Sequence, residues 1–380
     1  MAGPGAGRTV RVRAGRHLVS PRGELGGVLA TTQIPAVPPP ARTSPTAPRN
    51  DAPELLARLV FALAGRLPDT TAAVIRTRIA DGDIEEAART LRGALDDGPV
   101  GLTVAEAGLA QAGLAGFPDS SGFRPAHRTG PPARPEFRFS SPPDGPAARL
   151  LDAAVSVVGW TDGLAGLWLT LRTCHTATAA PVWLGEAQVG SDLIELTAEI
   201  QHRLASLGEV PPRVELFTAE SDLTPYHRGA LARADLVWVR SDLPEPQVAQ
   251  TFDGVDPTTG PYFAPEHARL DGPQRDRVLA YLAEADALLS SSGEMVDVLA
   301  PETGTRIPMV FRCDGTWIWT EPTVYYLRRY GLAPEPALVR HALRATGAPP
   351  SCGPLTRARA LAAITAPGTR PPAASTRPTP

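Results

Sequence analysis

The segment IPMVFRCDGTWIWT, residues 307–320, carries the clearest structural signal in the chain. Asp314 and Gly315 form a dipeptide that is favoured in two-residue β-hairpin turns, and apolar side chains flank it on both sides. Counting outward from this turn predicts the cross-strand pairs Arg312–Trp317, Phe311–Ile318 and Val310–Trp319. Both faces of the hairpin are apolar, so we expect other elements to cover both. We also expect a cation–π contact between Arg312 and Trp317.

Upstream of the hairpin, alternating and apolar runs predict a sheet with helices packed on it. Strands are expected at 167–172, 181–188, 213–218 and 236–239, and helices at 192–207, 225–233 and 273–289. The strand at 236–239 is entirely apolar, which indicates a position in the centre of the sheet. Prolines and glycines bound two further helices after the hairpin, at 322–330 and 334–345.

Nearer the N-terminus, helical spacing of leucines and a capping box of Thr103 and Glu106 predict a small helical bundle. The sequence therefore predicts an α+β fold. Its expected parts are a disordered, basic, proline-rich arm at 1–50, a helical module at 51–116, a proline-rich linker at 117–146, an α+β domain with a mixed sheet at 147–347, and a disordered basic tail at 348–380.

All 37 basic residues are arginines, so the chain contains no lysine. This excludes the usual forms of pyridoxal-phosphate enzymes, Walker-type nucleotide-binding proteins and protein kinases, because each needs a lysine amine. The net charge of −3 hides an asymmetry: residues 1–50 carry about +6 and residues 348–380 about +4, which leaves about −13 between them. An acidic body argues against nucleic-acid binding, except through the basic tails.

No apolar run is long enough to span a membrane, and no secretory signal is recognisable. Cys174, Cys313 and Cys352 are odd in number and lack metal-binding spacing. These features predict a cytoplasmic protein with reduced thiols, with no metal and no cofactor.

The long segment 240–272 lacks periodicity and contains Asp253, Asp256 and His267. These residue types can supply an acid and a base or bind a divalent cation, which makes them candidate catalytic residues. Their spacing matches no known ligand pattern, and a solvated surface loop explains the same residues.

Aromatic residues around the hairpin suggest a second candidate site. Trp317, Trp319 and Tyr325 could line a ligand pocket, although an aromatic core beneath the hairpin explains them as well. Catalytic motifs such as G-x-S-x-G and H-E-x-x-H do not occur in the sequence.

Several segments resemble a multi-copy actinobacterial protein family with no known activity. The resemblance extends over residues 51–347 and rests on the segments 66–69, 80–83, 216–238, 311–319, 325–327 and 331–332. It implies a genome type and a compartment, and it carries over no functional residue.

Two functional hypotheses follow. The first is a non-catalytic binding or regulatory protein that recognises a partner protein or a small ligand, both unidentified. The alternative is a hydrolase or transferase whose acid and histidine side chains lie in the 240–272 segment.

Overall fold

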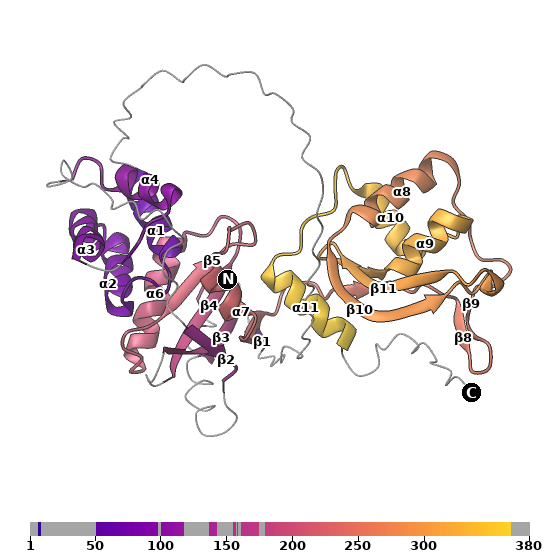
Figure 1. Cartoon of the computed structure of the whole chain (residues 1–380), viewed down its shortest axis with the longest axis horizontal. Helices are drawn as coiled ribbons and strands as arrows, with labels where there is room; N and C mark the ends of the chain where they lie inside the picture. The colour runs from indigo at the N-terminus through magenta and orange to yellow at the C-terminus, as the bar shows by residue number, and fades with distance from the viewer. Residues whose placement is uncertain are drawn as a thin grey trace, which may run out of the picture.

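In the described part of the chain, a six-stranded and a four-stranded sheet form the framework, and helices pack on both (Figure 1). The computed structural model describes residues 51–97, 100–117, 137–142, 155–156, 158, 161–174 and 179–365, and the backbone of residues 7–8. The predicted α+β class is confirmed. Within those ranges, no helix combines the length and the apolar composition that crossing a bilayer requires.

The helical module lies beside the first sheet. Its helices are α1 (Ala52–Ala62), α2 (Asp69–Ala80), α3 (Ile84–Asp97) and α4 (Val104–Gly113). The predicted capping box is present, because the Thr103 hydroxyl accepts from the Glu106 amide and the Glu106 carboxylate accepts from the Thr103 amide. Leu56, Ile75 and Leu91 belong to the shared apolar core of these helices.

The first sheet follows the order β1-β6-β3-β4-β5, and β2 pairs with β3. Its elements are β1 (Gly7–Arg8), β2 (Phe137–Ser140), β3 (Leu164–Cys174), β4 (Ala180–Ala187), α6 (Leu193–Ser206), β5 (Val214–Phe217), α7 (Pro225–Leu231) and β6 (Asp235–Arg240). Helix α6 connects the parallel strands β4 and β5 and covers one face with Leu196, Ile200 and Leu204. The predicted strands and helices of this region are therefore confirmed, with shifts of a few residues at their ends. The central position expected for the strand at 236–239 is wrong, because β6 lies between β3 and the two-residue edge strand β1.

The second sheet has the order β10-β11-β12-β7. The elements of this half are β7 (Gln247–Val248), β8 (Gly254–Asp256), β9 (Gly260–Tyr262), α8 (Gly272–Glu284), β10 (Ala287–Val296), the short 3₁₀ helix η3 (Pro301–Thr303), β11 (Arg306–Cys313), β12 (Trp317–Thr320), α9 (Glu321–Tyr330) and α10 (Pro336–Arg344). Trp317 and Trp319 pack with residues of α8, α9 and α10 on one face of this sheet.

The predicted hairpin is present, but the predicted register differs from the observed one by two residues. Arg312 pairs with Trp319 and Cys313 pairs with Ile318, because the connection is longer than two residues. The Asp314 carboxylate accepts hydrogen bonds from the Thr316 and Trp317 amides at 2.9 and 2.8 Å and stabilises the longer loop. Arg312 does not pair with Trp317 as predicted; its guanidinium group forms an ion pair of 2.9 Å with Glu321.

The predicted helix over 273–289 is too long. Helix α8 ends at Glu284. Leu288 and Leu289, which were expected at the end of this helix, belong to strand β10. Leu289 pairs with Phe311, and Arg312 donates to the carbonyls of Ala283 and Ala285. Pairing with β11 therefore overrides the local helical spacing.

The structure also differs from the expected tail at 348–380. Residues of that segment form helix α11 (Pro354–Thr365), which contacts both sheets. Leu355 packs against the first sheet, and its amide donates to buried Glu186 at 2.8 Å. Ala360 and Ile364 cover the second face of the hairpin, so this same chain provides the cover that the apolar pattern predicts.

Other parts of the predicted organisation are described only partly. Strand β2 lies within the expected linker at 117–146 and pairs with β3, because Phe137 and Phe139 pack against Tyr226. Phe117, Ser141 and Pro142 of that linker are also described, whereas the rest of the linker, most of the arm at 1–50 and the chain after Thr365 lie outside the described residues. The division into domains stays a prediction.

Candidate functional site

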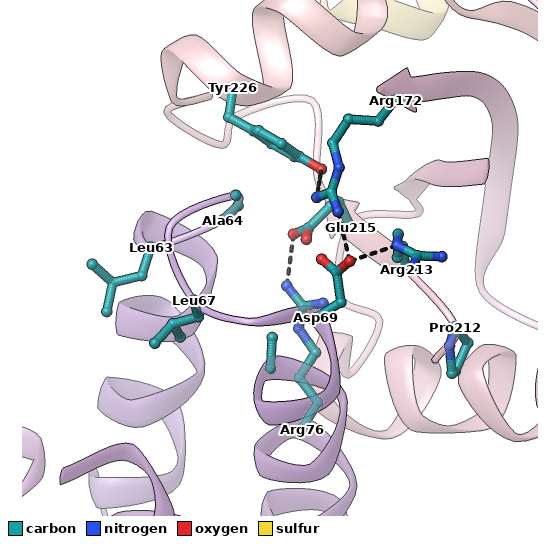
Figure 2. A pocket seen from close by; sticks show the side chains of 12 residues that line it. Leu63, Ala64, Leu67, Asp69, Arg76, Arg172, Pro212, Arg213, Glu215 and Tyr226 are labelled. Carbon is teal, nitrogen blue, oxygen red and sulfur yellow. Dashed lines mark hydrogen bonds and ion pairs between the residues drawn. The ribbon is translucent and has the colours of Figure 1, made fainter. Parts of the chain in front are cut away.

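A narrow crevice lies where the helical module meets the first sheet, and charged side chains from both line it (Figure 2). The residues around it are Leu63, Ala64, Gly65, Leu67, Asp69, Ala72, Arg76, Arg172, Pro212, Arg213, Glu215 and Tyr226. The space that remains between them is sufficient for about one water molecule. The chain therefore fills this crevice with its own side chains.

Asp69, the first residue of α2, holds two guanidinium groups of the sheet layer. Its Oδ2 atom accepts from Arg172 at 2.5 Å and from Arg213 at 2.7 Å. Burial opposes ionisation of Asp69, but the two arginines outweigh it and hold the pKa below its ordinary value. Arg172 and Arg213 together bind one carboxylate, that of Asp69.

Glu215 on β5 is the second carboxylate of the crevice and is almost fully buried. Arg76 of α2 donates to it at 2.6 Å and also donates to the backbone oxygen of Val214 at 2.6 Å. Burial raises the pKa of Glu215, yet Arg76 and His227 reverse this effect and the net pKa is lowered. Arg76 thus ties α2 to the edge strand of the sheet.

His227 on α7 contacts the same oxygen of Glu215 as Arg76 does, with 3.3 Å between Nε2 and Oε2. Its Nδ1 atom accepts from the Thr224 amide and lies 2.7 Å from the Thr224 hydroxyl, which makes Nε2 the protonated nitrogen. Acid, imidazole and hydroxyl follow the order of a hydrolase triad. However, His227 is fully buried, stacks on Phe61 at 4.0 Å, and forms the capping box of α7 with Thr224. Its role is structural.

Tyr226 closes the crevice against the turn after α1. Arg172 donates to its hydroxyl at 3.1 Å, and burial together with the charge of Glu215 raises the pKa of Tyr226 to about 12. Gly65 adopts a positive φ of 75°, and a side chain there would overlap the Tyr226 ring. Glycine is therefore required at this point of close approach.

The charges of this cluster balance within the described residues. Arg76, Arg172 and Arg213 face Asp69, Glu215 and Glu209, the last at 3.2 Å from Arg213. Each carboxylate of the cluster is therefore paired with at least one guanidinium group of the chain. The sequence alone did not indicate this arrangement, because Asp69, Arg172 and Arg213 come from three distant segments.

The structure brings together two of the three candidate residues of the 240–272 segment. His267 Nδ1 lies 2.8 Å from Asp253, and His267 Nε2 lies 2.9 Å from the backbone oxygen of Ala333. Asp253 also accepts from the Ala264 amide at 2.7 Å. Both nitrogens of His267 are therefore used to fasten the loop.

Asp256 lies apart from that pair. Its exposed carboxylate accepts from the amides of Thr258 and Thr259, each at 2.8 Å, in the turn between β8 and β9. These hydrogen bonds lower the pKa of Asp256. Among the described residues, no group of three or more histidine, cysteine, aspartate or glutamate side chains is arranged to hold a metal ion.

The three aromatic candidates also lie in two different places in the fold. Trp317 and Trp319 are buried in the core, where Trp319 donates to the Leu282 oxygen at 3.1 Å. Tyr325 faces a different cluster and donates to Asp297 at 2.9 Å. Burial and the bond to Asp297 raise the pKa of Tyr325 to about 12.

Nothing in the sequence indicated that the carboxylate of Asp314, in the hairpin turn, is buried. Asp314 accepts from Tyr281 at 2.8 Å and lies 2.7 Å from Nε2 of His341. The Asp-Gly dipeptide indicated a turn but gave no sign of these partners, which lie on α8 and α10.

Models of protein families yield no match to this chain. Neither the curated proteins nor the solved structures provide a match.

Proposed function

We propose that this protein acts by binding a partner protein that presents an aspartate or glutamate side chain, and that Arg172 and Arg213 recognise this carboxylate. The observation that carries the proposal is the pair of short contacts, 2.5 and 2.7 Å, between these arginines and Asp69. We call these two arginines the carboxylate receptor. In the free protein Asp69 occupies the receptor, so a partner must compete with it. This makes the helical module the regulated part of the molecule.

The hydrogen bonds of the other candidate residues support binding over catalysis. His267 uses both ring nitrogens inside the fold, and Asp256 caps a turn. We place this function in the cytoplasm, since Cys174, Cys313 and Cys352 are free thiols.

Photo-crosslinking in cells that normally make the protein tests this function. A photoreactive residue replaces Pro212, which lines the crevice, or Val104, which is 84% exposed on α4 outside it. We expect a protein adduct from position 212 that disappears when Arg213→Gln is added. The same adducts from both positions, or an adduct at 212 that persists with Arg213→Gln, would overturn the proposal.

The contact between Asp253 and His267 favours a second candidate function, a hydrolase or transferase with these residues as acid and base. Replacing Asp253, Asp256 and His267 by alanine tests it. If the variant keeps its fold and the cells keep the phenotype that depends on the protein, the enzymatic function is refuted.

A further inference from the structure

Two cysteines that are far apart in the sequence meet beside the hairpin turn. Cys313 ends β11 and is fully buried, whereas Cys352 is half-buried and lies just before α11. The Cys352 thiol donates a hydrogen bond to the backbone oxygen of Cys313 at 3.2 Å, and Cys352 packs against the apolar cluster that contains Cys313. The chain thus places the two cysteines side by side.

The surroundings favour a thiolate on this pair. The Gly315 amide donates to the Cys313 sulfur at 3.1 Å, which stabilises negative charge there. The neighbouring Cys352 thiol, together with that amide and the charge of Arg357, outweighs burial and the charge of Asp314 and lowers the pKa of the Cys313 thiol. The neighbouring Cys313 thiol and burial raise the pKa of Cys352. Of the two thiols, Cys313 is therefore the one that loses its proton more readily.

We propose that Cys313 and Cys352 are a site of reversible oxidation, at which hydrogen peroxide converts the two thiols into a disulfide. The Cys313 thiolate attacks one peroxide oxygen, so the O–O bond breaks and gives a sulfenic acid and hydroxide. The Cys352 sulfur then attacks the sulfenic sulfur, forms the S–S bond and releases water with its own proton. The hydroxide takes up the proton first lost by Cys313, so one peroxide gives one disulfide and two waters.

The position of α11 gives this disulfide a structural consequence. Arg357 of α11 donates to the oxygens of Ala287 and Leu288 on β10, and Leu355 packs on the first sheet. In the reduced protein these contacts are non-covalent. The disulfide fastens the start of α11 to β11 and so fixes the element that contacts both sheets.

Peptide mapping of the full-length protein tests the site. The protein is treated with hydrogen peroxide, unfolded, alkylated and digested with trypsin, which cleaves this lysine-free chain only after arginine. We expect the peptides 313–328 and 345–357 to appear joined, with two hydrogens lost, while Cys174 is alkylated. Dithiothreitol should separate them. If Cys313 and Cys352 are alkylated as fully as Cys174 after peroxide, or are linked to Cys174 as often as to each other, the proposal is wrong.

Two variants provide controls. Cys174→Ser should form the disulfide as the wild type does, and its Tm should rise on oxidation by on the order of 5 °C. Cys352→Ser should show no rise, with Cys313 halting at the sulfenic acid or more oxidised forms. An equal rise in both variants would contradict the assignment.

Discussion

The substitution Asp69→Asn should loosen the helical module from the first sheet. It removes the negative charge but keeps the shape of the side chain at the point where Arg172 and Arg213 converge. Each hydrogen bond to a charged group contributes about 1.5–3 kcal/mol. The three side chains are between 10% and 23% exposed, and both arginines keep other acceptors, so water and these acceptors recover part of the loss. We expect a net loss of about 2 kcal/mol.

Native-state hydrogen exchange measures this loss where it occurs. A loss of about 2 kcal/mol corresponds to roughly 30-fold faster exchange at the amides of α1 and α2 that open locally. Amides of α8 in the other half should be unaffected. The control Glu86→Gln removes an exposed carboxylate that pairs with Arg89, and it should change exchange less than about threefold. If Asp69→Asn changes α2 no more than this control, the network does not hold the module in place.

Three further predictions concern the crevice and the packing of α11 on the first sheet. Gly65→Ala should destabilise the protein by about 2–4 kcal/mol in urea unfolding, because it combines an unfavourable φ with overlap on the Tyr226 ring. The control Gly108→Ala, in the open interior of α4, should be neutral or stabilising. Equal effects of the two substitutions would refute this account. Because the pKa values of Asp69 and Glu215 are lowered in the folded state, their stabilisation is complete above the ordinary carboxylate pKa and is lost as pH falls through the folded values. The opening free energy of α2, taken from exchange rates corrected for the intrinsic pH dependence of amide exchange, should therefore fall below about pH 4, and Asp69→Asn should flatten this dependence. An identical pH profile would contradict this account. Leu355→Ala should lower the free energy of unfolding by about 3 kcal/mol, because α11 packs on the first sheet through this side chain. The control Val104→Ala, at an exposed position, should leave it almost unchanged. A loss below about 1 kcal/mol for Leu355→Ala would show that α11 contributes little to stability.

Much of the first sheet could be predicted because its signals are local. The apolar face of α6, the cap at Asp192 and the strand at 236–239 each depend on neighbouring residues only. The same holds for the faces of the hairpin. The distribution of its side chains over two faces is correct although the register is shifted, because a shift of two residues preserves which side chains share a face.

The elements that the sequence did not predict are determined by contacts with residues far away in the sequence. Leu288 and Leu289 have helical spacing, but pairing with β11 makes them a strand. Helix α11 is rich in alanine and arginine, and only its contacts with two sheets reveal that it is part of the core. The candidate site follows the same rule, since Asp69 lies 103 positions from Arg172 and 144 from Arg213 in the sequence. No spacing motif can represent such separations.

Rescue of Asp69→Ala by formate tests the central claim most directly. This variant removes the carboxylate that occupies the receptor, and formate is a free carboxylate that fits the space it leaves. We predict that formate raises the Tm of Asp69→Ala more than chloride does at equal ionic strength, and that the wild type and Asp69→Ala/Arg213→Gln show no such difference. If formate and chloride have the same effect on Asp69→Ala, Arg172 and Arg213 do not form a carboxylate receptor, and the proposed recognition of an acidic partner side chain is contradicted.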